Sequence, residues 1–335
     1  MTSFGSHVIA VAVVALIGFA AQRGNTCAVA AVDEAFHLRR FSILWSIIDV
    51  VVIVAGLYAA LHMAGLLTLA PKHAPVTWHT VLGGVLLGLG ACINGACTVG
   101  TVARIGSGDF AFLATPVGIF VGCGVASHFV RSWLPQITLI NAATNHLALA
   151  VLVVSVVVVG IRIWRGTGFF LVPDKQERLL HRTWNPRIAN SVIGVSFIVL
   201  ALVAGPWSYT DLLFRIARGD GSGTEFLVLL SIALFVGAVI GGWLMRRWRV
   251  RPVEVVALVR SFFGGAVMGV GLCLVPGAND GLTLEQVPLL IQSAIVAMVG
   301  LFGTVLFVVW VASKRSIVVS ASRREELRAS AAAAH

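Results

Sequence analysis

The stretch GGVLLGLGACINGACTVGT, residues 83–101, decides how this chain folds. It is apolar enough to lie in a bilayer, but its glycines weaken a helix and free backbone polar groups. Such a backbone is tolerated at membrane depth only where it lines a cavity or is buried in protein. We therefore expect a re-entrant or discontinuous helix here instead of a continuous lipid-facing one.

The composition of the whole chain agrees with a membrane setting. Of 335 residues, 58% are hydrophobic and 11% are charged, whereas a soluble domain carries about 25% charged residues. This excludes a soluble globular protein. Nine apolar segments approach or exceed the ~20 residues that cross a bilayer, so we predict an all-helical polytopic membrane protein. The segments are 7–21, 41–70, 80–103, 110–134, 137–164, 188–206, 225–245, 253–275 and 285–312.

The basic residues indicate the orientation of these spans. With nine spans and a cytoplasmic C-terminus, 20 of the 24 basic residues fall on the cytoplasmic side, and only Lys72, Arg131, Arg215 and Arg218 remain outside. This asymmetry is the positive-inside signature. The net charge of +10 sits in clusters between apolar runs, a pattern that does not indicate nucleic-acid binding. We predict a multi-pass membrane protein whose N-terminus lies outside and whose C-terminus lies in the cytoplasm.

A hidden repeat relates the two halves. A shift of 181 residues lays residues 83–100 over 264–281 with six identities in 18 positions, five glycines and Cys92 over Cys273. The same shift lays Gly24 over Gly205. Four spans, one linking span and four more would invert the halves, as in many secondary transporters. The alternative is that two glycine-rich helices resemble each other because both pack closely.

This repeat predicts the domain organisation. Residues 1–164 form the first repeat plus a linking helix, and 165–187 form a basic cytoplasmic loop. Residues 188–313 form the second, inverted repeat, and 314–335 form a basic cytoplasmic tail.

Three further stretches are predicted to break. Pro276 and Gly277 interrupt residues 264–282, and irregular sequence follows the first span at 22–27 and its repeat mate at 205–211. Half-helix N-termini that point inward offer N–H groups and positive dipole ends to an anion. The four breaks together are expected to line one central site.

Five cysteines lie in or beside apolar segments without a CxxC or zinc-like spacing. We therefore predict no metal site and no disulfide framework. A thiol suits a soft ligand, but free cysteine also serves as a buried apolar filler. We interpret Cys27 and Cys97, beside Gly and Thr in broken segments, as functional and Cys123 as filler. For Cys92 and Cys273 both interpretations stay open.

Two carboxylates lie at membrane depth, where charge is costly and often functional. Asp280 either acts in the site or caps the helix that starts after the second break. For Asp49 we favour pairing with a neighbour over proton coupling.

Three motifs together resemble those of the YeeE/YedE family of inner-membrane importers of thiosulfate and related sulfur compounds. They are QRGNTCAVAAVDE (22–34), GACINGACTVGTVARIGSGDF (90–110) and GLCLVPGANDGL (271–282). The resemblance implies nine spans with inverted pseudo-symmetry, and cysteines that pass the anion by S–H···S contacts. By this resemblance Cys27 and Cys97 match the first two motif cysteines. The third position is Ala278 here, and Cys273 is the nearest replacement.

We therefore predict a transporter that imports a small sulfur-containing anion along Cys27, Cys97, Cys273 and Cys92, with no enzymatic activity and no cofactor. The supporting and helix-breaking residues are Gly24, Asn25, Thr26, Gly95, Thr98, Gly100, Pro276, Gly277, Asn279 and Asp280.

The resemblance implies a cytoplasmic TusA-like sulfur carrier as partner. The basic loop Arg162–Arg187 is either its docking surface or a topology anchor. The rival functions are a membrane thiol oxidoreductase, which the lack of CxxC disfavours, and a sensor that binds the sulfur compound without net flux.

Overall fold

The structure is a computed structural model that describes residues 4–24, 27–67, 72–73, 75–129, 138–139, 145–164, 184–221, 223–245, 248–275 and 277–332. The first half contains α1 (Phe4–Gly24), α2 (Ala28–His37), α3 (Ser42–Met63), α4 (Trp78–Asn94), α5 (Thr98–Gly106), the 3-10 turn η1 (Phe110–Leu113) and α6 (Ala114–Phe129). Helix α7 (Asn145–Trp164) links it to the second half. That half contains α8 (Pro186–Val203), α9 (Tyr209–Ala217), α10 (Thr224–Leu244), α11 (Val255–Leu274), α12 (Asn279–Gly281), the π-helical turn η3 (Leu282–Gln286) and α13 (Gln292–Ala332).

The predicted membrane architecture is confirmed. Within the described ranges, eight helical stretches are long and apolar enough to cross a membrane, and α7 contributes a shorter apolar helix, Ala148–Arg162. Together these nine apolar helical segments agree with the nine expected spans. A two-residue antiparallel pair, β1 (Lys72–His73) with β2 (Thr138–Leu139), joins the loops after α3 and α6. Those two loops therefore lie on the same side of the bundle.

The helices repeat with the offset that the sequence indicates. Helices α1 to α6 return as α8 to α13, and each start recurs 181 residues later to within about four residues. The packing follows the same exchange: α1 packs on α10 as α8 packs on α3, and α6 packs on α11 as α13 packs on α4. A pseudo-two-fold relation between the halves produces such exchanged pairs.

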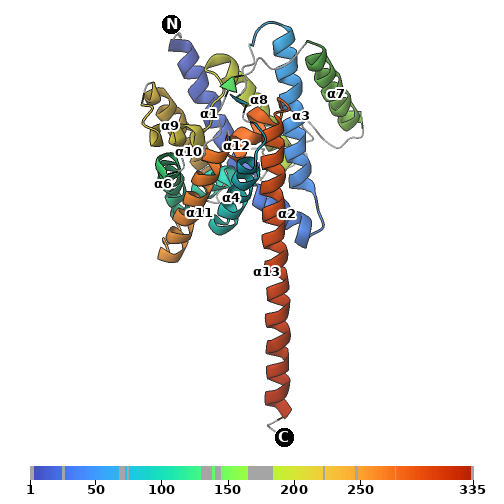
Figure 1. Ribbon diagram of the computed structural model, residues 1–335, viewed down its shortest axis with the longest axis vertical. Coiled ribbons are helices and arrows are strands. Elements are labelled where there is room, and N and C mark those ends of the chain that lie inside the picture. The colour runs from blue at the N-terminus through green and yellow to red at the C-terminus, as the bar shows by residue number, and fades with distance from the viewer. Residues whose placement is uncertain are drawn as a thin grey trace.

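Equivalent helices run in opposite directions. The N–H of Trp184, just before α8, donates to the carbonyl of Arg23 at the end of α1 (3.3 Å). Gly83 near the start of α4 lies against the end of α11, and Gly90 near the end of α4 lies against its middle. The repeats are therefore inverted. The N-terminus lies at one end of the bundle and α13 projects beyond the other (Figure 1), as an odd number of crossings requires.

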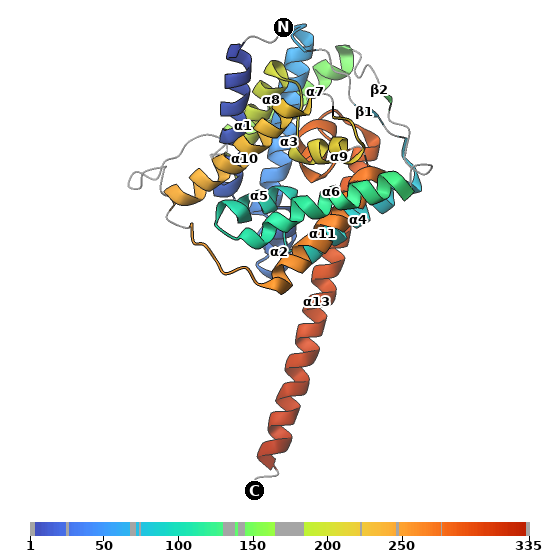
Figure 2. The same cartoon turned by 90° about the vertical axis from the view of Figure 1, so that its left-hand side faces the viewer.

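Glycines allow the close packing of these helices. A Cβ on Gly18 of α1 would lie 1.9 Å from the carbonyl oxygen of Leu234 on α10, and a Cβ on Gly237 would lie 1.9 Å from that of Ala15. Membrane helices approach this closely only where small residues stand at the contact. Figure 2 shows α10 crossing in front of α1 in the second view.

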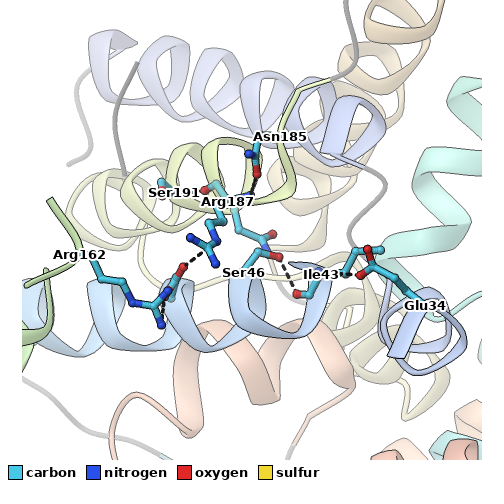
Figure 3. Close-up of polar contacts among 9 residues, drawn as sticks. Glu34, Ile43, Ser46, Arg162, Asn185, Arg187 and Ser191 are labelled. Carbon is cyan, nitrogen blue, oxygen red and sulfur yellow. Dashed lines mark hydrogen bonds and ion pairs between the residues drawn. The ribbon is translucent and has the colours of Figure 1, made fainter. Parts of the chain in front are cut away.

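Asp49 lies in a buried ionic cluster away from the central breaks. Its carboxylate, 2% exposed on α3, is 3.4 Å from Arg162 at the end of α7 and 3.7 Å from Arg187 at the start of α8. Figure 3 shows Arg162 and Arg187 reaching toward α3, where they form these ion pairs. The expected pairing of Asp49 is confirmed, and it fixes the linking helix and the second repeat to α3. Nearby, Glu34 accepts from the N–H of Ile43 (2.9 Å) at the start of α3.

The predicted domain bounds are only partly covered by the described residues. Residues 165–183 of the basic loop lie outside them, so that loop stays a prediction. At the other predicted bound, between 313 and 314, α13 continues without a break to Ala332.

Candidate functional site

All four expected breaks are present, and each is followed by a short helix. Cys27 precedes α2, Cys97 precedes α5, Ser208 precedes α9 and Ala278 precedes α12. Each residue has an extended backbone at the N-cap position. The 181-residue shift pairs Cys27 with Ser208 and Cys97 with Ala278. The site is thus built from four equivalent helix starts.

The structure brings Cys27 and Cys97 together. The N–H of Cys97 points at the Sγ of Cys27 at 3.2 Å, and the N–H of Gly100 points at the Sγ of Cys97 at 3.5 Å. Both side chains are under 5% exposed, and all five cysteines of the chain are free thiols. The positive end of α5 therefore faces two soft sulfur atoms.

Asn94 holds the break between α4 and α5, a role that the sequence analysis missed. Gly95 takes a left-handed conformation (φ +78°) at the end of α4. The side-chain amide of Asn94 donates to the carbonyl of Ala96 (2.8 Å) and to the hydroxyl of Thr101 (3.0 Å), and its oxygen accepts from Thr115 (2.9 Å). The sequence does carry a signal for it, since Asn94 is a polar residue beside a glycine within an apolar stretch.

Hydroxyl groups from both halves surround Asp280. The Oγ1 of Thr210 on α9 is 3.1 and 3.2 Å from the two carboxylate oxygens, and the Oγ1 of Thr98 on α5 is 3.4 Å from one of them. The phenol of Tyr209 donates to the carbonyl of Thr98 (3.0 Å). Ser208, Tyr209 and Thr210 were missed, although the repeat shift lays Ser208 over Cys27.

Two small cavities meet at this cluster. One of about 60 Å³ extends toward α1, α10 and Trp207, and one of about 40 Å³ extends toward α2, α3 and Asn190. Both are lined by Val99, Asp280, Ile193 and Leu284. A water molecule takes about 30 Å³ in the liquid, so each cavity has room for one or two. The thiols of Cys27 and Cys97 do not line these two cavities, although their near neighbours Ala28 and Val99 do.

A larger cavity of about 320 Å³ lies between the ends of α6 and α9. It is lined by Gly124, Ser127 and His128 on α6, by Ala217 at the end of α9 and by Arg218, which follows it. Next to Gly124, the Cys123 thiol donates to the carbonyl of Gly269 (3.4 Å), and the Cys273 thiol lies 3.8 Å from the carbonyl of Cys123.

The structure therefore places Cys273 in the interface of α6 and α11, beside Cys123. Among the described residues, no hydrogen bond connects Cys273 to Cys27 or Cys97. Its repeat mate, Cys92, is half-buried on α4.

The remaining predicted residues have mixed positions. Gly24 is the buried last residue of α1, Gly277 has φ +153°, and Asn279 starts α12 and lines the smaller cavity. Asn25, Thr26 and Pro276 lie outside the described residues. Within the described part of the chain, no group of three His, Cys, Asp or Glu is arranged to hold a metal ion.

Comparison with known proteins points to one family. A profile of the family described as "Sulphur transport" matches residues 23–307. The thiosulfate transporter TsuA of Escherichia coli (strain K12) is 26% identical over 334 aligned positions, which cover 89% of this chain and 91% of TsuA. The matched region begins just before the first break and includes all four.

Proposed function

The chain belongs to the sulphur transport family, and we propose that it imports a small sulfur-containing anion, thiosulfate or a related compound, across a bacterial inner membrane. The observation that carries this proposal is the 3.2 Å contact of Cys27 and Cys97, where two short helices of the first repeat, α2 and α5, start. Transporters with inverted repeats bind their substrates near mid-membrane at discontinuous helices. The described similarity to a thiosulfate transporter supports thiosulfate as the first substrate to test.

We infer the following path. The anion collects in the cavity lined by Arg218 and His128, because Arg218 is one of the few basic residues assigned to the outer side. It then passes Cys273, beside the cavity wall, and reaches Cys97 and Cys27. Cys92, the repeat mate of Cys273, borders the path on α4. The inner end opens near the cytoplasmic end of α2.

The thiols act by non-covalent contacts in this proposal. A neutral S–H group is a weak donor and a polarisable partner for sulfur. A thiolate would repel an anion in a low-dielectric passage. The N-termini of α2, α5 and α9 add partial positive charge. Their fixed dipoles favour the anion without placing a full positive charge in the membrane.

The proposal of import includes a direction of transport and an orientation of the chain in the membrane. The 20-to-4 distribution of basic residues supports a periplasmic N-terminus and a cytoplasmic tail. Reporter fusions at Met1 and after Arg323 test this topology. A reporter at Met1 that is active in the cytoplasm would overturn it.

The cytoplasmic partner is proposed as a TusA-like sulfur carrier. Two arginines of the basic loop, Arg162 and Arg187, already bind Asp49. They support the anchoring role of the loop more than a docking role. A pull-down of purified carrier by the full-length protein, compared with a variant lacking basic side chains between 165 and 183, tests the interaction.

The central experiment measures uptake of radiolabelled thiosulfate, sulfite, selenite and persulfides into proteoliposomes. Saturable uptake of thiosulfate, lost in Cys97→Ala, is the expected result. Binding without net flux would indicate a sensor. A Cys27–Cys97 disulfide that cycles during turnover, detected by mass spectrometry, would indicate a thiol oxidoreductase.

A further inference from the structure

Asp280 places a negative charge next to the proposed path of the anion, because its carboxylate lies 3.4 Å from the hydroxyl of Thr98, the residue after Cys97. Its carboxylate is 8% exposed and receives hydroxyl contacts from Thr210 and Thr98, one on each repeat. A carboxylate at this depth is costly, and residues of this kind are typically retained for function. Its side-chain hydrogen-bond partners are neutral hydroxyls, whereas the Asp49 carboxylate, which is also buried, lies beside two arginines.

Asp280 lies where the two small cavities meet. One extends toward α1 and α10, the other toward α2 and α3, and both have Asp280 in their walls. The repeat mate of Asp280 is Val99, which also lines both cavities. The point at which the pseudo-symmetric halves meet is thus apolar on one side and acidic on the other.

An ionised Asp280 would repel an anion that reaches Cys97, the residue before Thr98. Coulomb repulsion between two negative charges is strong at low effective dielectric and weakens sharply when one is neutralised. We propose that Asp280 binds a proton from the outer side before the anion passes and releases it to the inner side afterwards, so that a proton accompanies each anion. This inference rests on the proposed function and deepens it by naming the coupling ion and its carrier.

The charge balance of import makes such coupling useful. Bringing a dianion into a negatively charged cell is opposed by the membrane potential, in proportion to the charge moved. A proton carried on the same step reduces that opposition. The proton binds to and leaves one carboxylate oxygen, and no bond in the substrate changes.

Asp280 is not alone among ionisable groups in this region. Helix α9 contributes Tyr209 and Asp211. The Cys97 thiol lies at the start of α5, and the turn η3 that follows α12 carries Glu285. Asp211 adds a second negative charge, which further disfavours an anion while both carboxylates are ionised. Among the described residues lining the two cavities, Asp280 is the sole carboxyl group and Tyr209 the only other ionisable one.

The test uses the full-length protein in proteoliposomes with the membrane potential clamped at zero by valinomycin and equal potassium. Thiosulfate is the probe because, unlike sulfite, it stays fully ionised near neutral pH. If one proton moves with each anion, steady-state accumulation should rise about tenfold per unit of inward pH gradient. In Asp280→Asn, a neutral isostere that can still accept from Thr210, thiosulfate should equilibrate without responding to the gradient.

Asp220→Asn is the matched control, because Asp220 is an exposed carboxylate that pairs with Arg215 outside the cavities. It should keep the wild-type response. If Asp280→Asn does not fold, the pH dependence of uptake in Thr210→Val tests the proposal instead. Loss of that hydroxyl removes a donor that stabilises the ionised carboxylate, so the pH at which uptake falls to half should move upward.

The outcomes separate the two proposals. Thiosulfate accumulation that ignores the pH gradient in the wild type, a gradient response that survives in Asp280→Asn, or an unmoved profile in Thr210→Val would overturn the role of Asp280 and leave the importer intact. A wild-type protein that takes up no thiosulfate under any gradient would overturn the proposed function itself.

Discussion

The two halves of the molecule share a backbone and differ in chemistry where their short helices start. In the first half, Cys27 and Cys97 stand at the N-caps of α2 and α5. In the second, Ser208 and Ala278 occupy the matching positions. The Oγ of Ser208 caps its own helix by accepting from Asp211 (3.2 Å). A symmetric scaffold therefore carries soft groups in one half and hard oxygen groups in the other.

This difference separates two tasks. Polarisable thiols suit contact with a sulfur anion, and hydroxyls around a carboxylate suit the binding of a proton. The scaffold itself requires neither arrangement, since Ser208 and Ala278 start helices as well as the cysteines do. Exchanging features between the halves is therefore the way to test which residues act on the substrate.

The largest effect is expected from Cys97→Ala, which makes the first half like the second, where Ala278 stands. Uptake of thiosulfate should be abolished, because the soft contact next to Cys27 is lost. The fold should persist, since single substitutions typically cost about 0.5–3 kcal/mol. Uptake assays together with thermal unfolding of the purified protein measure both. Loss of folded protein, or uptake near the wild-type level, would contradict the functional role of Cys97.

A strong effect is also expected from Gly100→Ala. A Cβ there would lie 2.7 Å from the Sγ of Cys27 and 3.0 Å from its Cβ, so the cysteine must move. Its repeat mate, Gly281, has open space around the same position. Uptake should fall about tenfold or more in Gly100→Ala, as displacing a positioned group can do, and should change little in Gly281→Ala. Similar losses in both variants would mean that the effect is not local to Cys27.

A partial effect is expected from Cys27→Ser, which copies Ser208 into the first half. Serine is a stronger hydrogen-bond donor with a smaller, less polarisable atom, so a non-covalent relay should keep part of its activity. A covalent persulfide relay needs the sulfur nucleophile, and serine would then be as inactive as alanine. Uptake by Cys27→Ser and Cys27→Ala, with a mass-spectrometric search for a persulfide, distinguishes the mechanisms.

The spans, the inverted repeat and the four breaks were predictable because they follow from local properties. Apolar length defines a span, and glycines and Pro276 weaken a helix wherever they stand. The offset of 181 residues also contained the signal for Ser208, which it lays over Cys27, although the sequence analysis did not use it. The spans, the repeat and the breaks could therefore be found from the sequence without knowing which residues touch.

The contacts of the site were not predictable, because they join residues far apart in sequence. Asp280 meets Thr98 across 182 residues and Thr210 across 70. Asp49 and Asp280 look alike in sequence, as single carboxylates in apolar segments. Only the fold gives two arginines to one and hydroxyls to the other. The placement of Cys273 beside Cys123 likewise depends on the packing of α6 against α11.

The smallest effects are expected at the α6–α11 interface, where two thiols are neighbours with different proposed roles. Cys123 is fully buried and donates to the Gly269 carbonyl, so Cys123→Ala should leave uptake nearly unchanged. Cys273→Ala should lower uptake a few-fold, because the proposed path passes it before Cys97. Transport rates at low substrate concentration give the most sensitive comparison, since an outer site affects capture first. If both variants transport like the wild type, the path reaches Cys97 without Cys273, and the first half alone supplies the thiols.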